Sequence, residues 1–322
     1  MLSVVLGQLP RQGMAGRMPG PTAVASFHRA GFVRIIKYGE DETEQGGGAV
    51  AAGRARERPG SRANPCRQGC DLIPMSPLKR IRRRLRIWAS YVAMVLAGMA
   101  GFLFFRFPLN FTRVRGRSNI PWRGEGVLFV SNHITMYDSF LIGVAAYFPE
   151  YILYPSLPFM NFAARENYFR TWFSRTLFAL LRTVPVERRD HPWLMRKYTA
   201  FLERHNLLIF YQGTRSADLT AIRNGPAFAI AHTRSPITVI PVYHHGIERI
   251  FSRGGPKTRG LWRWLPRSIF HRPVVMFGKP IDFSECSRIT ETRARITAIN
   301  RRIVASIAAL QTLATATPAQ SN

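Results

Sequence analysis

Acidic residues are scarce in this sequence. The 322 residues include 18 Asp and Glu against 46 Lys and Arg, which gives a formal net charge of +28. Such an excess of cations implies an anionic partner: nucleic acid, an anionic membrane surface or a phosphorylated substrate. The sequence lacks zinc-finger spacing, basic-zipper heptads and the aromatic signature of RNA-recognition modules, so we expect no nucleic-acid partner.

Cysteine is nearly absent. Cys66, Cys70 and Cys286 are an odd number without metal-ligand spacing, which is typical of reduced thiols that have no function. The pair His244-His245 also lacks a third ligand at suitable spacing, and we interpret it as structural. The sequence therefore predicts no metal site and no cofactor.

Long apolar runs are also rare, and the longest extends from Trp88 to Phe105 without a charge. As a helix it would be about 27 Å long at about 1.5 Å per residue, slightly short of a hydrocarbon core of about 30 Å. The basic residues 79–86 precede it, and such a cluster is attracted to an anionic leaflet. Further arginines follow the run, so charge does not set an orientation. A spanning helix, a helix embedded in one leaflet and a buried core helix all stay open.

Residues 1–74 are rich in Gly, Pro, Arg and Ala and show little apolar periodicity. Three interpretations compete. Residues 1–38 contain no acid, as in a mitochondrial transit peptide; the segment can equally be a disordered tail. We favour a third, that it is a mis-annotated extension and that the chain begins at Met75. The expected organisation is then this extension, a basic segment and membrane helix over 75–110, and a folded domain over 111–322.

Within the folded domain, short apolar runs predict buried strands at 127–130, 207–210, 237–240 and 274–277. Helices are predicted over 139–148, over an aromatic-rich segment at 161–182 and over 289–313. Alternating strands and helices indicate an α/β fold with a mixed, mostly parallel sheet flanked by helices. The aromatic-rich segment also carries arginines, so its side chains belong either to the core or to a lipid-facing surface.

A histidine and an aspartate follow the first of these strands. His133 and Asp138 are five residues apart, directly after the run at 127–130. A carboxylate that binds one imidazole nitrogen fixes the tautomer and leaves the other nitrogen free to take a proton. The spacing alone is common, but a second apolar strand ends in Gly213-Thr214-Arg215. There, glycine permits close approach of the backbone to an anion, and arginine can grip phosphate.

The order of these blocks resembles the glycerophospholipid acyltransferase family, of which 1-acylglycerol-3-phosphate acyltransferase is the best-known type. The resemblance covers about residues 115–282. Its four blocks are Asn132-His133-x4-Asp138-Ser139, Val186-Glu187-Arg188, Phe210-Tyr211-Gln212-Gly213-Thr214-Arg215-Ser216 and Ile240-Pro241-Val242, and Gly278-Lys279-Pro280-Ile281 matches a later strand terminus. Four blocks in order are far more specific than any one of them.

The resemblance implies an enzyme of phospholipid biosynthesis. It would transfer a fatty acyl group from acyl-CoA or acyl-carrier protein to lysophosphatidate or a related lysophospholipid. His133 would be the general base, oriented by Asp138. Arg188, Gln212, Gly213, Thr214 and Arg215 would bind the acceptor. The basic cluster at 79–86 beside the apolar run predicts an anionic membrane surface as partner. The expected location is a bacterial inner membrane, with the catalytic domain on the cytoplasmic side.

The third block departs from the family, which usually has Pro-Glu where this chain has Tyr211-Gln212. A glutamine keeps an acceptor oxygen but adds a donor and loses the charge. This change predicts either a different acceptor or reduced activity. The alternative function is therefore a catalytically silent lipid-binding or membrane-scaffold protein of the same fold, which the intact His133 and Asp138 oppose.

Overall fold

A mixed, mostly parallel sheet lies at the centre of the described structure, with β1 (Arg113–Arg115) and β7 (Val274–Phe277) running opposite to the other five strands. The structure is a computed structural model that describes residues 77–122, 126–187, 191–252 and 265–316. All of these residues belong to one unit, Gly47–Asn322. The extension over 1–74 lies outside the described residues, so its interpretation stays a prediction.

The sheet has the strand order β1-β7-β6-β2-β5-β3-β4. Every neighbouring pair is parallel except β6 and β7. The expected mixed, mostly parallel sheet is therefore confirmed. The strands are β1 (Arg113–Arg115), β2 (Val127–Ser131), β3 (Met160–Ala164), β4 (Thr183–Val186), β5 (Leu207–Phe210), β6 (Thr238–His245) and β7 (Val274–Phe277).

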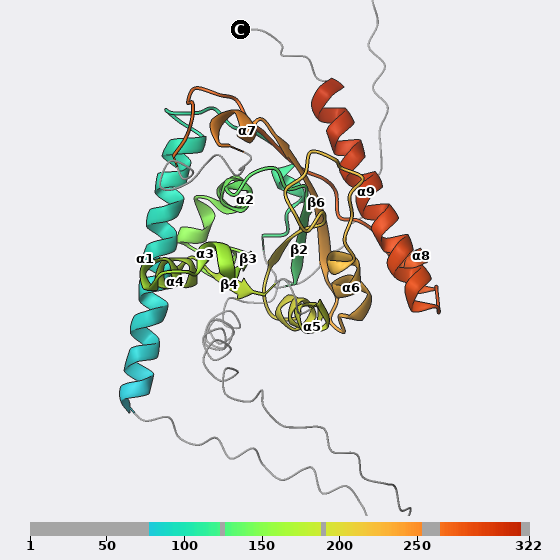
Figure 1. Cartoon of the computed structure of the whole chain (residues 1–322), viewed down its shortest axis with the longest axis horizontal. Coiled ribbons are helices and arrows are strands. Elements are labelled where there is room, and N and C mark those ends of the chain that lie inside the picture. Colours follow the sequence, from blue (N-terminus) through green and yellow to red (C-terminus); the bar gives the residue numbers. More distant parts are fainter. Residues whose placement is uncertain (1–76, 123–125, 188–190, 253–264, 317–322) are drawn as a thin grey trace, which may run out of the picture. The chain divides into compact units, whose positions relative to one another are not determined.

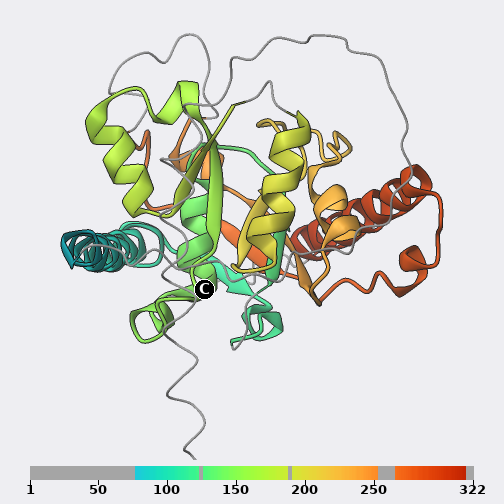
Figure 2. The same cartoon turned by 90° about the horizontal axis from the view of Figure 1, so that it is seen from below.

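Helices cover both faces of the sheet (Figures 1 and 2). On one side lie α1 (Pro77–Phe105), α2 (Asp138–Tyr147) and α4 (Trp172–Leu180). On the other lie α5 (His191–Leu202), α6 (Gly225–His232) and α9 (Thr292–Ala316). The remaining helices are short: α3 (Arg165–Tyr168), α7 (Ile247–Ile250), α8 (Ser284–Ser287) and the 3-10 turns η4 (Arg117–Asn119) and η5 (Glu150–Ile152).

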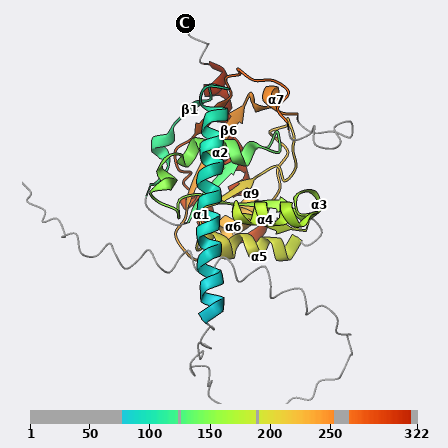
Figure 3. The ribbon, with the colours of Figure 1, turned by 90° about the vertical axis from the view of Figure 1, so that its left-hand side faces the viewer.

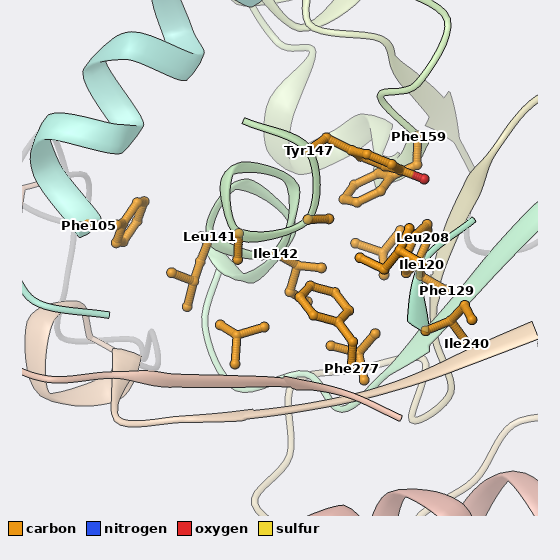
Figure 4. Close-up of a cluster of buried hydrophobic side chains, with 14 of the residues drawn as sticks. Phe105, Ile120, Phe129, Leu141, Ile142, Tyr147, Phe159, Leu208, Ile240 and Phe277 are labelled. Atoms are coloured by element: carbon orange, nitrogen blue, oxygen red, sulfur yellow. The ribbon is translucent and has the colours of Figure 1, made fainter. Parts of the chain in front are cut away.

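The main apolar core lies between α2 and the sheet (Figure 4). Leu141 and Ile142 of α2 and Phe129 and Phe277 of the sheet are at most 2% exposed, and Phe105 brings the end of α1 into the same cluster. Each such side chain contributes roughly 1.5–3 kcal/mol relative to an exposed one. This packing fixes α2 against the strands, and with it the position of the first residue of the helix, Asp138.

Helix α1 packs against the domain along its second half (Figure 3). Ser90 Oγ donates to Leu180 O at 2.7 Å, and Tyr91 Oη donates to Ile152 O at 2.7 Å. Gly98 and Gly101 are buried, and a side chain at either would collide with Tyr151 or with Phe140 and Val144. Among the described residues, α1 is also the one helix long and apolar enough to cross a membrane.

The prediction of a helix over 161–182 is wrong for its first part. Met160–Ala164 is strand β3, which pairs with β5 on one side and β4 on the other, and helix returns only in α3 and α4. Pairing on both sides outweighs the local preference of this segment. Pro185 in β4 fits this arrangement, because β4 is the edge strand and needs no donor on its outer side.

Candidate active site

Three of the expected sequence blocks meet at one edge of the sheet. β2 and β5 are parallel neighbours, and β6 runs parallel to β2 on its other side. Because the carboxyl ends of parallel strands lie at the same edge, the residues after Ser131 and Phe210 come together beside the end of β6. Ser216 N donates to His133 O at 2.9 Å, which joins the first block to the third.

The expected His–Asp pair forms. His133 Nδ1 lies 2.9 Å from Asp138 Oδ2, and the carboxylate is fully buried while the imidazole is 20% exposed. The His133 ring stacks on Phe210, with centroids 4.0 Å apart and planes 13° apart. A carboxylate can only accept, so Nδ1 carries the proton and Nε2 holds the lone pair. Nε2 is therefore the nitrogen able to accept a proton from a substrate.

The loop between the two residues folds around the carboxylate. Asp138 Oδ2 accepts from Ile134 N at 2.5 Å, and Oδ1 accepts from Thr135 Oγ1 at 2.6 Å, while Thr135 N lies within 3.0 Å of both oxygens. Burial alone would raise the pKa of the Asp138 carboxyl. The neighbouring His244 and His133 imidazoles and the Thr135 hydroxyl outweigh burial and hold that pKa below its usual value. Asp138 is thus kept as a carboxylate.

Gln212 links the third block to the backbone of the histidine. Its side chain is buried; Oε1 accepts from His133 N at 2.6 Å, and Nε2 donates to Ser216 O at 3.2 Å and to Asp218 O at 2.5 Å. The acceptor and the donors of one amide are all used. A glutamate in the same place could accept from His133 N but could not donate to the two carbonyl oxygens.

The other departure from the family pattern contacts the same loop. Tyr211 is buried, its hydroxyl donates to Leu219 O at 2.8 Å, and burial raises the pKa of that phenol. Tyr211 and Gln212 therefore both bind carbonyl oxygens of residues 216–219. The two unusual residues together brace this loop.

Three of the expected acceptor-binding residues, Gly213, Thr214 and Arg215, lie on the exposed side of the same turn. Gly213 has φ 68°, a left-handed conformation that favours glycine, and a side chain there would collide with Arg223. Thr214 and Arg215 are exposed and directly precede the residue bonded to His133 O. Arg188 lies outside the described residues. Its neighbour Glu187 pairs with Arg165 at 2.9 Å.

Sequence reasoning missed Thr135, Phe210 and His244 as neighbours of the pair. Thr135 had a local signal, because a hydroxyl three residues before a buried carboxylate can bond to it. Phe210 and His244 had no local sequence signal, since their contacts depend on which strands are adjacent. Within the described ranges, no group of three or more His, Cys, Asp or Glu is placed to hold a metal ion.

A surface groove of about 440 Å³ lies elsewhere, between α9, the middle of β6 and the residues that follow β7. It is lined by residues that include Pro241, Lys279, Arg302 and Ala305. None of the residues at the His–Asp pair lines it, and we assign no substrate to it.

The chain is similar to a known family and to a solved structure. The family model described as Acyltransferase matches residues 111–245, which contain all four sequence blocks. The chain is similar to the crystal structure of the 1-acyl-sn-glycerophosphate (LPA) acyltransferase PlsC from Thermotoga maritima, with a TM-score of 0.42, 18% sequence identity, and 73% of this chain and 85% of that chain covered. No curated protein matches the chain. Residues 111–245 are therefore similar to acyltransferase domains, which agrees with the family resemblance expected from the sequence.

Proposed function

We propose that this protein transfers a fatty acyl group from a thioester, acyl-CoA or acyl-carrier protein, to the hydroxyl of lysophosphatidate or a related lysophospholipid. The observation that carries the proposal is the 2.9 Å contact between His133 Nδ1 and a buried, fully hydrogen-bonded Asp138. It supports a base at an exposed sheet edge, within a segment similar to acyltransferase domains.

The chemistry is one direct transfer. Nε2 of His133 takes the proton of the acceptor hydroxyl as its oxygen attacks the thioester carbonyl carbon. The C–S bond then breaks, the ester forms, and the thiolate leaves with the proton from the imidazolium. Asp138 stabilises that imidazolium through Nδ1–H. A positioned base supplies about 10²–10⁴ in rate, and ordering of the two substrates supplies much of the rest.

The acceptor phosphate would bind at the turn after β5. Gly213 is exposed, Thr214 offers a hydroxyl, and the Arg215 guanidinium can form bidentate contacts with phosphate. The bond from Ser216 N to His133 O holds this turn beside the base. Arg188 completes the proposed acceptor-binding set. Gln212, expected from the sequence to bind the acceptor, instead uses its whole amide to hold the turn beside His133.

An acyl-transfer assay tests this function. Membranes that contain the protein are given labelled acyl-CoA or acyl-carrier protein and a panel of lysophospholipids. We expect acylation of lysophosphatidate or a close relative, lost in His133→Ala and kept in His232→Ala, whose exposed imidazole contacts Phe228 in its own helix. Absence of transfer with every donor and acceptor would instead favour the silent lipid-binding protein.

We also propose that the domain sits on one leaflet of a membrane. A stripe of exposed apolar residues runs along α1 at helical spacing, and α4 adds Trp172 and Phe173, which are 80% and 67% exposed. Basic residues at 79–86 flank the stripe, as in helices that lie at an anionic interface. The second half of α1 is bonded to the domain, which favours embedding in one leaflet over spanning. The stripe consists of Leu78, Ile81, Leu85, Trp88, Val92, Leu96, Met99 and Leu103.

Fluorescence quenching by brominated lipids tests the lipid-facing surface. In vesicles, we expect brominated acyl chains to quench Trp172 but not Trp122, which packs against the core and under Arg117. The quenched fraction of total tryptophan emission should therefore fall in Trp172→Phe and rise in Trp122→Phe. A quenched fraction that stays equal or rises in Trp172→Phe would show that α4 faces water.

A further inference from the structure

A second histidine lies against the carboxylate of the proposed base. His244 is near the end of β6, and its side chain is 0% exposed. Its strand neighbours are apolar: Val275 of β7 is directly opposite, and Val242 precedes it on the same face. A buried imidazole in such surroundings needs hydrogen-bond partners, because an unpaired buried polar group is costly.

The His244 ring meets both ends of the loop that carries the base. Nε2 lies 3.0 Å from Asn132 O and 3.5 Å from Asp138 Oδ2. Since a carbonyl oxygen only accepts, Nε2 carries a proton. That N–H therefore faces both the residue before His133 and the carboxylate oxygen that binds His133 Nδ1.

The backbone of His244 also binds the side chain of Asn132. Asn132 Nδ2 donates to His244 O at 2.9 Å, and His244 N donates to Asn132 Oδ1 at 3.0 Å. All of these groups are buried. The link continues the pairing of β2 and β6 beyond Ser131 and Val242, up to the residue that precedes the base.

We propose that His244 is a positioning residue for the His133–Asp138 pair. The inference rests on the proposed acyl transfer. The ring N–H of His244 holds the Asn132 carbonyl and the Asp138 carboxylate in one arrangement. In this arrangement Nδ1 of His133 contacts Oδ2 of Asp138. A fully buried side chain does not contact substrate, so its loss should lower kcat with little change in KM.

Substitutions at His244 distinguish the N–H from the bulk of the ring. The amide nitrogen of glutamine can reach the place of Nε2, whereas asparagine is too short and leucine has no donor. We expect kcat to fall by roughly 10- to 100-fold in His244→Leu and His244→Asn, as for misplaced catalytic groups, and to be largely restored in His244→Gln. The matched control is His245→Leu, because successive side chains in a strand point to opposite faces.

Thermal unfolding of each variant accompanies the kinetics. If His244→Leu does not fold, the test is the comparison of kcat between His244→Asn and His244→Gln, since both substitutions introduce a polar amide. Equal kcat in the asparagine, glutamine and wild-type proteins would overturn the proposal, as would a loss of kcat in His245→Leu as large as in His244→Leu.

A second measurement does not depend on turnover. The proton between His133 and Asp138 should give a downfield NMR resonance that disappears in His133→Ala. We expect this resonance to move in His244→Asn but not in His244→Gln or His245→Leu. An inactive wild-type protein would refute the proposed acyl transfer and leave this comparison in force, whereas an unmoved resonance in His244→Asn would refute the role of His244.

Discussion

Replacing Asp138 by asparagine is expected to lower kcat for acyl transfer by about 10²–10⁴, the range that a positioned base supplies. Four donors converge on the carboxylate: the backbone N–H groups of Ile134 and Thr135, the Thr135 hydroxyl and His133 Nδ1. An asparagine would place an NH₂ group against some of these donors. The ring of His133 then loses the contact that keeps the proton on Nδ1, and Nε2 is no longer held as the acceptor.

Initial rates of the single and double variants measure this effect. Because His133 and Asp138 act as one unit, the double variant His133→Ala with Asp138→Asn should be no slower than His133→Ala alone. The matched control is Asp282→Asn, which neutralises an exposed carboxylate that accepts hydrogen bonds from Ser284 and lies near Arg302, away from the His–Asp pair. Rate losses that multiply in the double variant would mean that the two residues act independently.

Restoring the family's usual residue should harm this protein. In Gln212→Glu the carboxylate can still accept from His133 N, but it faces the carbonyl oxygens of Ser216 and Asp218, to which the glutamine donates. The buried negative charge repels both oxygens, and the turn that carries Arg215 should loosen. Because small displacements of catalytic groups can cost about 10²-fold, we expect kcat/KM for the lysophospholipid acceptor to fall by about 10- to 100-fold.

Steady-state kinetics and hydrogen exchange over residues 213–219 test this expectation together. Faster exchange should accompany the loss of rate in Gln212→Glu. The double variant Tyr211→Pro with Gln212→Glu, which restores the family pair, also removes the bond from Tyr211 to Leu219 O and should loosen the loop further. An increase in acyl transfer in either variant would show instead that glutamine reduces the activity of this chain.

Much of the sheet could be predicted because its central strands are short apolar runs. β2, β5 and β7 begin within one residue of their predicted starts, and β6 continues beyond its predicted end to His245. β1 was missed because its three residues, Arg113–Arg115, are mostly charged and owe their strand conformation to pairing with β7. β3 was missed because its aromatic surroundings resemble a helix face, and only its two neighbours make it a strand.

In the candidate site, too, contacts between residues close in sequence could be predicted and contacts between strands distant in sequence could not. Residues close in sequence, such as His133 and Asp138, have a spacing that predicts their contact. The two hydrogen bonds between the Asn132 side chain and the His244 backbone join residues 112 positions apart, and no local sequence pattern indicates them. The role of Gln212 was also hidden, because the sequence shows the loss of a charge but not the two carbonyl oxygens that need a donor.

The close packing of α1 against α2 limits how this protein can be shortened. Two of its glycines leave room for Tyr151, Phe140 and Val144, and the latter two belong to the helix that begins with Asp138. Deleting α1 to obtain a water-soluble fragment would uncover those aromatic rings. Exchanging it for an arbitrary apolar anchor with larger side chains at these two positions would push α2 away from the strands. Helix α1 and the helix that presents the Asp138 carboxylate therefore hold each other in place.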